Sequence, residues 1–300
     1  MRSGYVALLG RPNVGKSTLL NHLLEQKISI TSAKPQTTRH VLLGIKTLTE
    51  ANAQIVYVDT PGLHKSAKRA INRHMNRAAA DTLSYVDCVV MLVAASQWTE
   101  EDESVLKRLQ TFKKPVILAI NKIDRVADKA GLLPFIQSIS EKYDFAQVVP
   151  ISALRQIQLD QLECNIVQFL PIGAALFAED QLTTASQRFL AAEIIREKLT
   201  RMLHDELPYA LTVEIEGFTE EPEGQPNMLH IDAVIWVERA GQKGIVIGRG
   251  GRTLKEVGQQ ARTDMARLFD CKVHLQTWVK VRSGWSDDEK ALKGLGYFDS

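Results

Sequence analysis

A short segment near the amino terminus restricts the folds that this chain can adopt. Its residues, Gly10-Arg11-Pro12-Asn13-Val14-Gly15-Lys16-Ser17, have the spacing of a phosphate-binding loop and stand between the apolar run Tyr5 to Leu9 and a helical pattern from Thr18. A strand, such a loop and a helix form the arrangement in which backbone N–H groups surround phosphate oxygens. The segment therefore predicts an α/β fold that binds a nucleoside triphosphate, with Lys16 at the β- and γ-phosphates and the Ser17 hydroxyl on Mg²⁺.

Apolar runs alternate with helical stretches from Arg2 to about Leu170, which is the rhythm of a mostly parallel sheet covered by helices on both faces. The predicted strands are Val6 to Leu9, Ile55 to Val58, Cys88 to Val93, Val116 to Ile120 and Val148 to Ile151. A further run, Val41 to Ile45, is followed by a polar stretch and predicts an antiparallel hairpin with the next strand at the sheet edge. The fold class predicted for this part of the chain is an α/β P-loop domain.

The tetrapeptide Asp59-Thr60-Pro61-Gly62 follows the end of a predicted strand, where ligands bind in open α/β sheets. Its Asp59 carboxylate would hold Mg²⁺ through water, and the N–H of Gly62 would contact the γ-phosphate. A plain Pro-Gly turn is the alternative interpretation.

A second tetrapeptide, Asn121-Lys122-Ile123-Asp124, also follows a predicted strand and indicates which base is bound. A carboxylate at Asp124 accepts two hydrogen bonds from the N1–H and N2–H₂ groups of guanine, whereas adenine would leave it unpaired. Lys122 would pack on the base plane, and Asn121 would tie this loop to the phosphate loop. Ser152-Ala153 follows another strand, and we expect the N–H of Ala153 to face guanine O6.

These motifs, in this order, resemble those of the translation-factor-type GTPases, and Gln36-Thr37-Thr38-Arg39-His40 resembles the first switch of the Era branch. The resemblance implies that Thr38 reaches Mg²⁺ and the γ-phosphate; two threonines that begin an edge strand are the alternative. Leu63 stands where many GTPases have the glutamine that orients the attacking water. The resemblance implies compensation by K⁺ held partly by Asn13, so we expect slow GTP hydrolysis that K⁺ stimulates.

The rest of the chain predicts an α+β domain. A helix with one apolar face is followed by two strand-like runs, then Gly248-Arg249-Gly250-Gly251, a long helical stretch and a strand from Val273 to Val281. The order helix, strand, strand, helix, helix, strand matches a type II KH domain, whose GxxG loop approaches nucleic-acid phosphates. Between Lys243 and Gly284 nine basic residues stand against three acidic ones, although the net charge of the chain is only +2. A solvated basic surface is the alternative to nucleic-acid binding.

An amino-terminal GTPase joined to a KH domain resembles the Era family of ribosome-assembly GTPases over essentially the whole chain. The resemblance implies a GTP-binding domain at residues 1–172, a linker at 173–184, a KH domain at 185–282 and an RNA-reading tail at 283–300. It also implies a GTP/GDP switch that binds the 3′ end of small-subunit rRNA and the pre-small ribosomal subunit, and so acts in small-subunit assembly. The alternative is a membrane-associated signalling GTPase whose KH domain binds a partner other than RNA.

The composition is that of a globular protein in a reducing compartment. The longest apolar run, Cys88 to Ala95, is too short to span a membrane, and the three cysteines lack metal-ligand spacing. We expect a cytoplasmic monomer, and the family resemblance implies peripheral association with the inner membrane.

The predicted site residues fall into four groups. Catalytic roles are assigned to Lys16, Thr38 and Gly62. The nucleotide-binding residues are Gly10, Arg11, Pro12, Asn13, Val14, Gly15, Lys16, Ser17, Thr18, Asp59, Thr60, Pro61, Gly62, Asn121, Lys122, Asp124, Ser152 and Ala153. The Mg²⁺ ligands are Ser17, Thr38 and Asp59, and the K⁺ ligand is Asn13. The RNA-binding residues are Gly248, Arg249, Gly250, Gly251, Arg252, Lys255, Arg282 and Trp285, of which Trp285 either stacks on a base or packs against its own domain.

Overall fold

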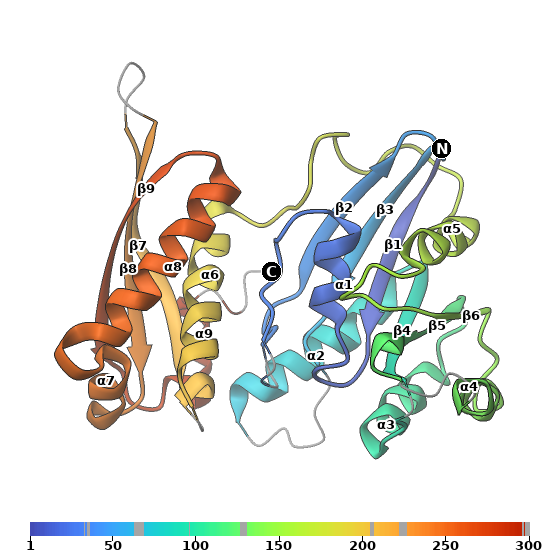
Figure 1. Ribbon diagram of the computed structural model, residues 1–300, viewed down its shortest axis with the longest axis horizontal. Helices are drawn as coiled ribbons and strands as arrows, with labels where there is room; N and C mark the ends of the chain where they lie inside the picture. The colour runs from blue at the N-terminus through green and yellow to red at the C-terminus, as the bar shows by residue number, and fades with distance from the viewer. Residues whose placement is uncertain are drawn as a thin grey trace. The chain divides into compact units, whose positions relative to one another are not determined.

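The computed structural model describes residues 1–32, 34, 37–62, 69–95, 97–126, 131–204, 207–221, 227–295 and 297. The chain forms two compact units (Figure 1). The first consists of Met1–Ser29, Thr38–Lys68 and Asn72–Thr184, and the second of Ile30–Thr37, Arg69–Ile71 and Ala185–Ser300.

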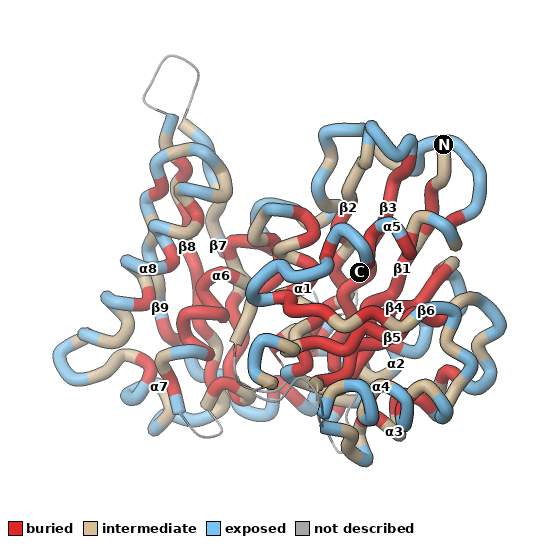
Figure 2. Tube along the Cα trace, turned by 45° about the vertical axis from the view of Figure 1, so that its right-hand side comes forward, coloured by how far each residue is buried: buried red, intermediate tan, exposed pale blue. Residues whose placement is uncertain are grey.

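The first unit is built on a six-stranded sheet. In spatial order its strands are β2 (Leu42–Leu48), β3 (Ala53–Asp59), β1 (Arg2–Leu9), β4 (Cys88–Ala94), β5 (Val116–Asn121) and β6 (Gln147–Pro150). All neighbouring pairs are parallel except β2 and β3, which form the antiparallel hairpin predicted at the edge. The strands β3, β4 and β5 are buried along their whole length (Figure 2), as expected when helices cover both faces.

Helices cover both faces of this sheet. They are α1 (Lys16–Leu23), α2 (Ala70–Tyr85), α3 (Glu100–Leu109), α4 (Leu132–Ser140) and α5 (Leu159–Phe169). Ala79 of α2, Val105 of α3 and Ile139 of α4 share one apolar cluster with alternate residues of the strands, so these three helices lie on one face. The helices α1 and α5 lie on the other face (Figure 1). The predicted α/β class is confirmed.

The segment predicted as a linker lies along the edge of the first unit's sheet. The Ile45 N–H donates to Leu182 O at 2.8 Å, and Thr183 Oγ1 donates to Leu43 O at 2.6 Å. Gln54, which is fully buried, accepts at Oε1 from the N–H groups of Leu176 at 2.7 Å and Phe177 at 3.0 Å. The bonds of Ile45 and Leu43 satisfy part of the exposed edge of β2, and the bonds to Gln54 of β3 fix the same segment on the first unit.

The second unit has the predicted order of elements. They are α6 (Gln187–Met202), β7 (Leu211–Glu220), β8 (Met228–Val237), α7 (Ala240–Ile247), α8 (Arg252–Phe269) and β9 (Lys272–Val281). In the sheet β7-β8-β9, β7 and β8 are antiparallel whereas β8 and β9 are parallel. Ser186 caps α6 by accepting a hydrogen bond from the Phe189 N–H. This is the predicted α+β architecture of a type II KH domain.

The core of the second unit lies between its sheet and the helices α6 and α8. Leu199 of α6, Ala261 of α8 and Ile235 of β8 are all fully buried in one apolar cluster. After β9 the chain continues through a 3₁₀ turn (Trp285–Asp287) and the short helix α9 (Glu289–Gly294). Among the described residues, no helix is both long enough and apolar enough to cross a membrane.

Candidate nucleotide-binding site and nucleic-acid groove

The phosphate loop links β1 to α1 at the carboxyl edge of the sheet. Gly15 has φ 108°, and a Cβ there would lie 2.4 Å from Asn121 Nδ2, so only glycine fits this turn. The buried Lys16 ammonium donates to Gly10 O at 2.9 Å and Arg11 O at 3.1 Å. Burial lowers the pKa of Lys16 from 10.5 to about 8, while Asp59 acts in the opposite direction. Phosphate oxygens bound at this loop would place negative charge beside the buried ammonium and so stabilise its charged form.

Three side-chain oxygens meet beside Lys16. Ser17 Oγ donates to Asp59 Oδ2 at 2.8 Å and lies 2.8 Å from Thr38 Oγ1. Asp59 is fully buried, and its Oδ1 has no hydrogen-bond partner in the described part of the chain. Burial raises the pKa of Asp59, and the neighbouring Lys16, Ser29 and Ser17 oppose that shift. A buried carboxylate oxygen next to two hydroxyls is a hard oxygen donor set, so the predicted Mg²⁺ ligands fit that ion.

Ser29 is a member of this cluster that sequence reasoning missed. Its Oγ donates to Asp59 Oδ2 at 2.8 Å, and its backbone N–H is held by Asn21 Oδ1 at 2.9 Å. A lone serine between α1 and β2 carries no motif, so only the folded chain reveals this contact.

The predicted base-recognition loop is joined to the phosphate loop. Asn121 Nδ2 donates to Val14 O at 2.8 Å, as predicted, and Lys122 Nζ donates to Asn13 O at 2.6 Å. Ser152 Oγ donates to Asp124 Oδ1 at 2.5 Å and so orients the carboxylate assigned to guanine. The Ala153 N–H was expected to face guanine O6. In the structure it instead donates to Asn121 Oδ1 at 2.9 Å and is therefore occupied within the protein.

Gly62 passes close to the phosphate loop. A Cβ on Gly62 would lie 3.0 Å from Pro12 Cγ and 3.2 Å from its backbone, so a larger residue would displace one of the two segments. Thr60 lies in the fully buried part of this segment, and its hydroxyl donates to Leu8 O at 2.9 Å. Gln36 and Leu63, on which parts of the switch interpretation depend, lie outside the described residues.

A second anchor of the phosphate loop was not predicted. Arg11 Nε donates to Asp102 Oδ2 at 3.1 Å, and Asp102 is fully buried at the start of α3. Asp102 also accepts from Thr99 N–H at 3.0 Å, completing a capping box with Thr99. The spacing of Thr99 and Asp102 before a helix signals the capping box in the sequence, but not the contact with Arg11.

In the second unit, the GxxG segment turns between α7 and α8. Gly248, Gly250 and Gly251 have φ values of 73°, 61° and 77°, the left-handed region that favours glycine. Arg249 and Arg252 are both exposed. The loop and the first residue of α8 therefore present backbone and two guanidinium groups to solvent, as an RNA-phosphate site requires.

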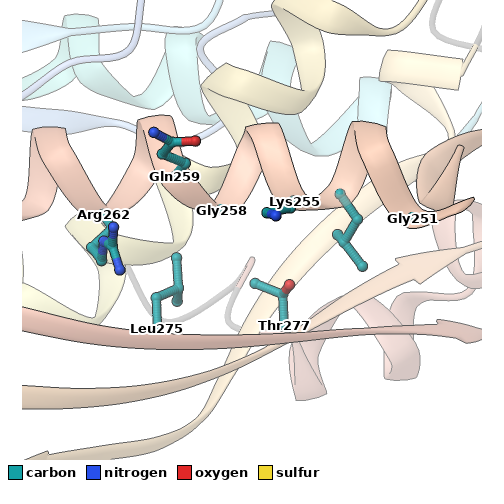
Figure 3. A pocket seen from close by; sticks show the side chains of 8 residues that line it. Gly251, Lys255, Gly258, Gln259, Arg262, Leu275 and Thr277 are labelled. Atoms are coloured by element: carbon teal, nitrogen blue, oxygen red, sulfur yellow. The ribbon is translucent and has the colours of Figure 1, made fainter.

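A groove of about 430 Å³ runs from this loop between α8 and β9 (Figure 3). It is lined by Gly251, Leu254, Lys255, Gly258, Gln259, Arg262, Leu275 and Thr277. Lys255 and Arg262 are exposed at its rim, and Leu275 lies on the wall formed by β9. An apolar wall beside cationic side chains suits an unpaired base with its phosphates outside.

The two predicted RNA-binding residues that follow the groove residues in the sequence differ in their exposure to solvent. Arg282 is exposed at the end of β9, whereas Trp285 is fully buried. The indole N–H of Trp285 donates to Ala210 O at 3.4 Å, and its ring lies 6.2 Å from that of Tyr297. A base cannot stack on Trp285 in this conformation, which corrects its assignment as an RNA contact, because the apolar ring is covered by its own domain.

Comparison with known proteins agrees with both units. Residues 5–122 match the family model of the 50S ribosome-binding GTPases, and residues 206–286 match that of the KH domain. The chain is 56% identical to GTPase Era of Pseudomonas aeruginosa strain LESB58 over 99% of its own length and 96% of the relative's. It is also 56% identical to GTPase Era of Azotobacter vinelandii, covering 100% of this chain and 98% of the relative.

Two solved structures are similar over both units. A crystal structure of Era with MgGDPNP and nucleotides 1506–1542 of 16S ribosomal RNA has 39% identity and a TM-score of 0.94, and the match covers 99% of each chain. An Aquifex aeolicus Era variant bound to GDP and AlF₄⁻ has 39% identity and a TM-score of 0.93, again over 99% of each chain. With a full-length identity of this size and both domains in the same order, the chain belongs to the Era family of GTPases.

Proposed function

We propose that this chain is a GTP-dependent RNA-binding switch that binds the 3′ end of small-subunit ribosomal RNA and acts in assembly of the small subunit. The groove between α8 and β9 supports the proposal most directly, because it joins a GxxG loop to cationic and apolar side chains. The similar Era structure that holds nucleotides 1506–1542 of 16S ribosomal RNA supports the choice of RNA.

The residues of the first unit have distinct tasks in GTP hydrolysis. The Lys16 ammonium would bind the β- and γ-phosphates, and Gly62, next to Pro12, would offer its N–H to the γ-phosphate. Asp124, oriented by Ser152, would accept the N1–H and N2–H₂ groups of guanine. Ser17, Asp59 and Thr38 would hold Mg²⁺, which neutralises charge on the phosphate oxygens when bound.

K⁺ is proposed as a second ion, with Asn13 as one ligand. Asn13 is exposed on the phosphate loop and has φ 62°, and its side-chain carbonyl is an oxygen donor suited to an alkali cation. The rate of GTP hydrolysis should be several-fold higher in KCl than in NaCl at equal ionic strength. Asn13→Ala should remove this difference. Equal wild-type rates in the two salts would contradict the K⁺ assignment.

RNA binding can be tested with paired charge reversals. The combined change Arg249→Asp and Arg252→Asp should abolish binding of an oligonucleotide with the rRNA 3′-end sequence but leave GTP affinity unchanged, because Arg249 lies in the GxxG loop and Arg252 follows it at the start of α8. Arg267→Asp is the control for a single charge reversal, to be compared with Arg249→Asp and Arg252→Asp made one at a time, since Arg267 is exposed on α8 but does not line the groove.

The control should lower the affinity only slightly, and wild-type binding should weaken steeply as salt rises. Binding to anionic vesicles with no preference for the RNA would contradict the proposal and favour the membrane-associated alternative.

A further inference from the structure

Gly258 occupies an unusual place for a glycine, near the middle of the 18-residue helix α8. Glycine in a helix interior lowers stability relative to alanine, because it loses more backbone freedom on folding. Helix formation therefore does not account for a glycine at this position.

The fold of the second unit does not account for Gly258 either. Gly248 and Gly251, at the end of the same groove, have φ values of 73° and 77° that other residues adopt with strain. Gly258 has helical backbone angles, and a Cβ built on it meets no heavy atom within 4 Å. Alanine would therefore fit at position 258 without strain and without a clash.

The open space beside Gly258 is the groove itself. Gly251, Leu254, Lys255, Gly258 and Arg262 follow the spacing of one helix face, and all five line the groove. In Figure 3 Gly258 lies between Gln259 and Lys255 along the helix, with Leu275 and Thr277 across from it on β9. A side chain at position 258 would extend into the space between the two walls.

We propose that Gly258 is a nucleic-acid contact residue, at which the missing side chain lets one unpaired base lie against the backbone of α8. Leu275 and Thr277 form the opposite wall, and Lys255 and Arg262, placed before and after Gly258 on the helix, meet the phosphates on either side. This inference rests on the proposed RNA binding and deepens it, because it identifies the part of the groove that contacts the base.

The test combines two measurements, of stability, which should rise, and of RNA affinity, which should fall. Gly258→Ala in the full chain should raise the thermal unfolding midpoint, since alanine favours the helix and meets open space. The same change should raise the Kd for a labelled single-stranded oligonucleotide with the rRNA 3′-end sequence by about fivefold or more, because a methyl group occupies the base position. Gly258→Leu should raise that Kd further.

Gly241→Ala is the matched control. Gly241 is an exposed helical glycine of α7, a Cβ there also meets no atom within 4 Å, and it does not line the groove. The control should leave the RNA Kd at the wild-type value.

Two results would overturn the inference. One is a stabilised Gly258→Ala protein whose RNA Kd matches those of wild type and Gly241→Ala. The other is a lowered unfolding midpoint for Gly258→Ala, which would mean that the fold itself requires this glycine. Failure of the proposed function is distinct, since the wild-type protein itself would then show no preference for the RNA.

Discussion

The protonation of Lys16 makes nucleotide binding depend on pH. Without nucleotide, burial lowers the pKa of Lys16 to about 8. Phosphate oxygens next to the ammonium would raise that pKa again, so nucleotide binding above pH 8 should take up a proton. At pH 9, one unit above that pKa, about one molecule in ten retains the proton, and GDP affinity should be about tenfold lower than at pH 7.

The lowered pKa of Lys16 also determines how the stability of the nucleotide-free protein changes with pH. A lysine whose pKa is lower in the folded state destabilises the nucleotide-free protein below pH 8, and this penalty disappears as pH rises toward 10.5. The nucleotide-free protein should therefore gain stability from Lys16 over the same pH range in which it loses GDP affinity.

Fluorescence titration with a labelled GDP at pH 7, 8 and 9 measures the effect, and calorimetry in buffers of different ionisation enthalpy counts the protons. Lys16→Met is the control, because it removes the ammonium but leaves the base site intact. Any pH effect that comes from titration of the guanine base therefore remains in this variant. The wild-type affinity should fall with pH more steeply than that of the variant. Parallel profiles for the two proteins would refute the assignment of this proton to Lys16.

Four further variants test single contacts. Asp102→Asn should lower the free energy of unfolding by about 1.5–3 kcal/mol, the range for a charge-assisted hydrogen bond, and should weaken GTP and GDP binding alike through Arg11. Its control, Thr99→Ala, should lower the free energy of unfolding by about 1 kcal/mol and leave both affinities unchanged. Equal nucleotide affinities in the wild type and both variants would contradict the anchoring role of Asp102. Asp124→Asn should weaken GTP binding at least about a hundredfold and improve xanthosine triphosphate binding, measured by competition, because the amide donates to the xanthine 2-oxo group. Gln54→Ala should leave the N–H groups of Leu176 and Phe177 without their acceptor and speed limited proteolysis between residues 173 and 184, whereas an unchanged cleavage rate would mean that other contacts suffice to hold this segment.

The sequence predicted those parts of the molecule that depend on local spacing. The phosphate loop, the strands β3, β4 and β5 and the order of elements in the KH domain follow from glycine spacing and apolar periodicity, which act over a few residues. The same holds for Asn121, whose contact with Val14 follows from the requirement that two loops meet at one edge of the sheet.

The missed contacts depend on segments that are far apart in the chain. Arg11 and Asp102 are 91 residues apart, and Gln54 meets Leu176 over 122 residues, so no local pattern relates them. Trp285 was open to two interpretations, because an aromatic residue after a strand is equally suited to a stacking surface and to a small core. Its burial against Ala210 and Tyr297 depends on how the tail folds back on the domain.

A switch requires that nucleotide binding and RNA binding are coupled, and one affinity measurement tests this coupling from both sides. The Kd of a non-hydrolysable GTP analogue should be measured with and without a saturating rRNA 3′-end oligonucleotide, and the Kd of GDP likewise. The RNA should tighten analogue binding by the factor by which the analogue tightens RNA binding, with a smaller effect on GDP, since linkage between two sites is reciprocal. An analogue Kd unchanged by RNA would show that the two sites act independently and would contradict the switch.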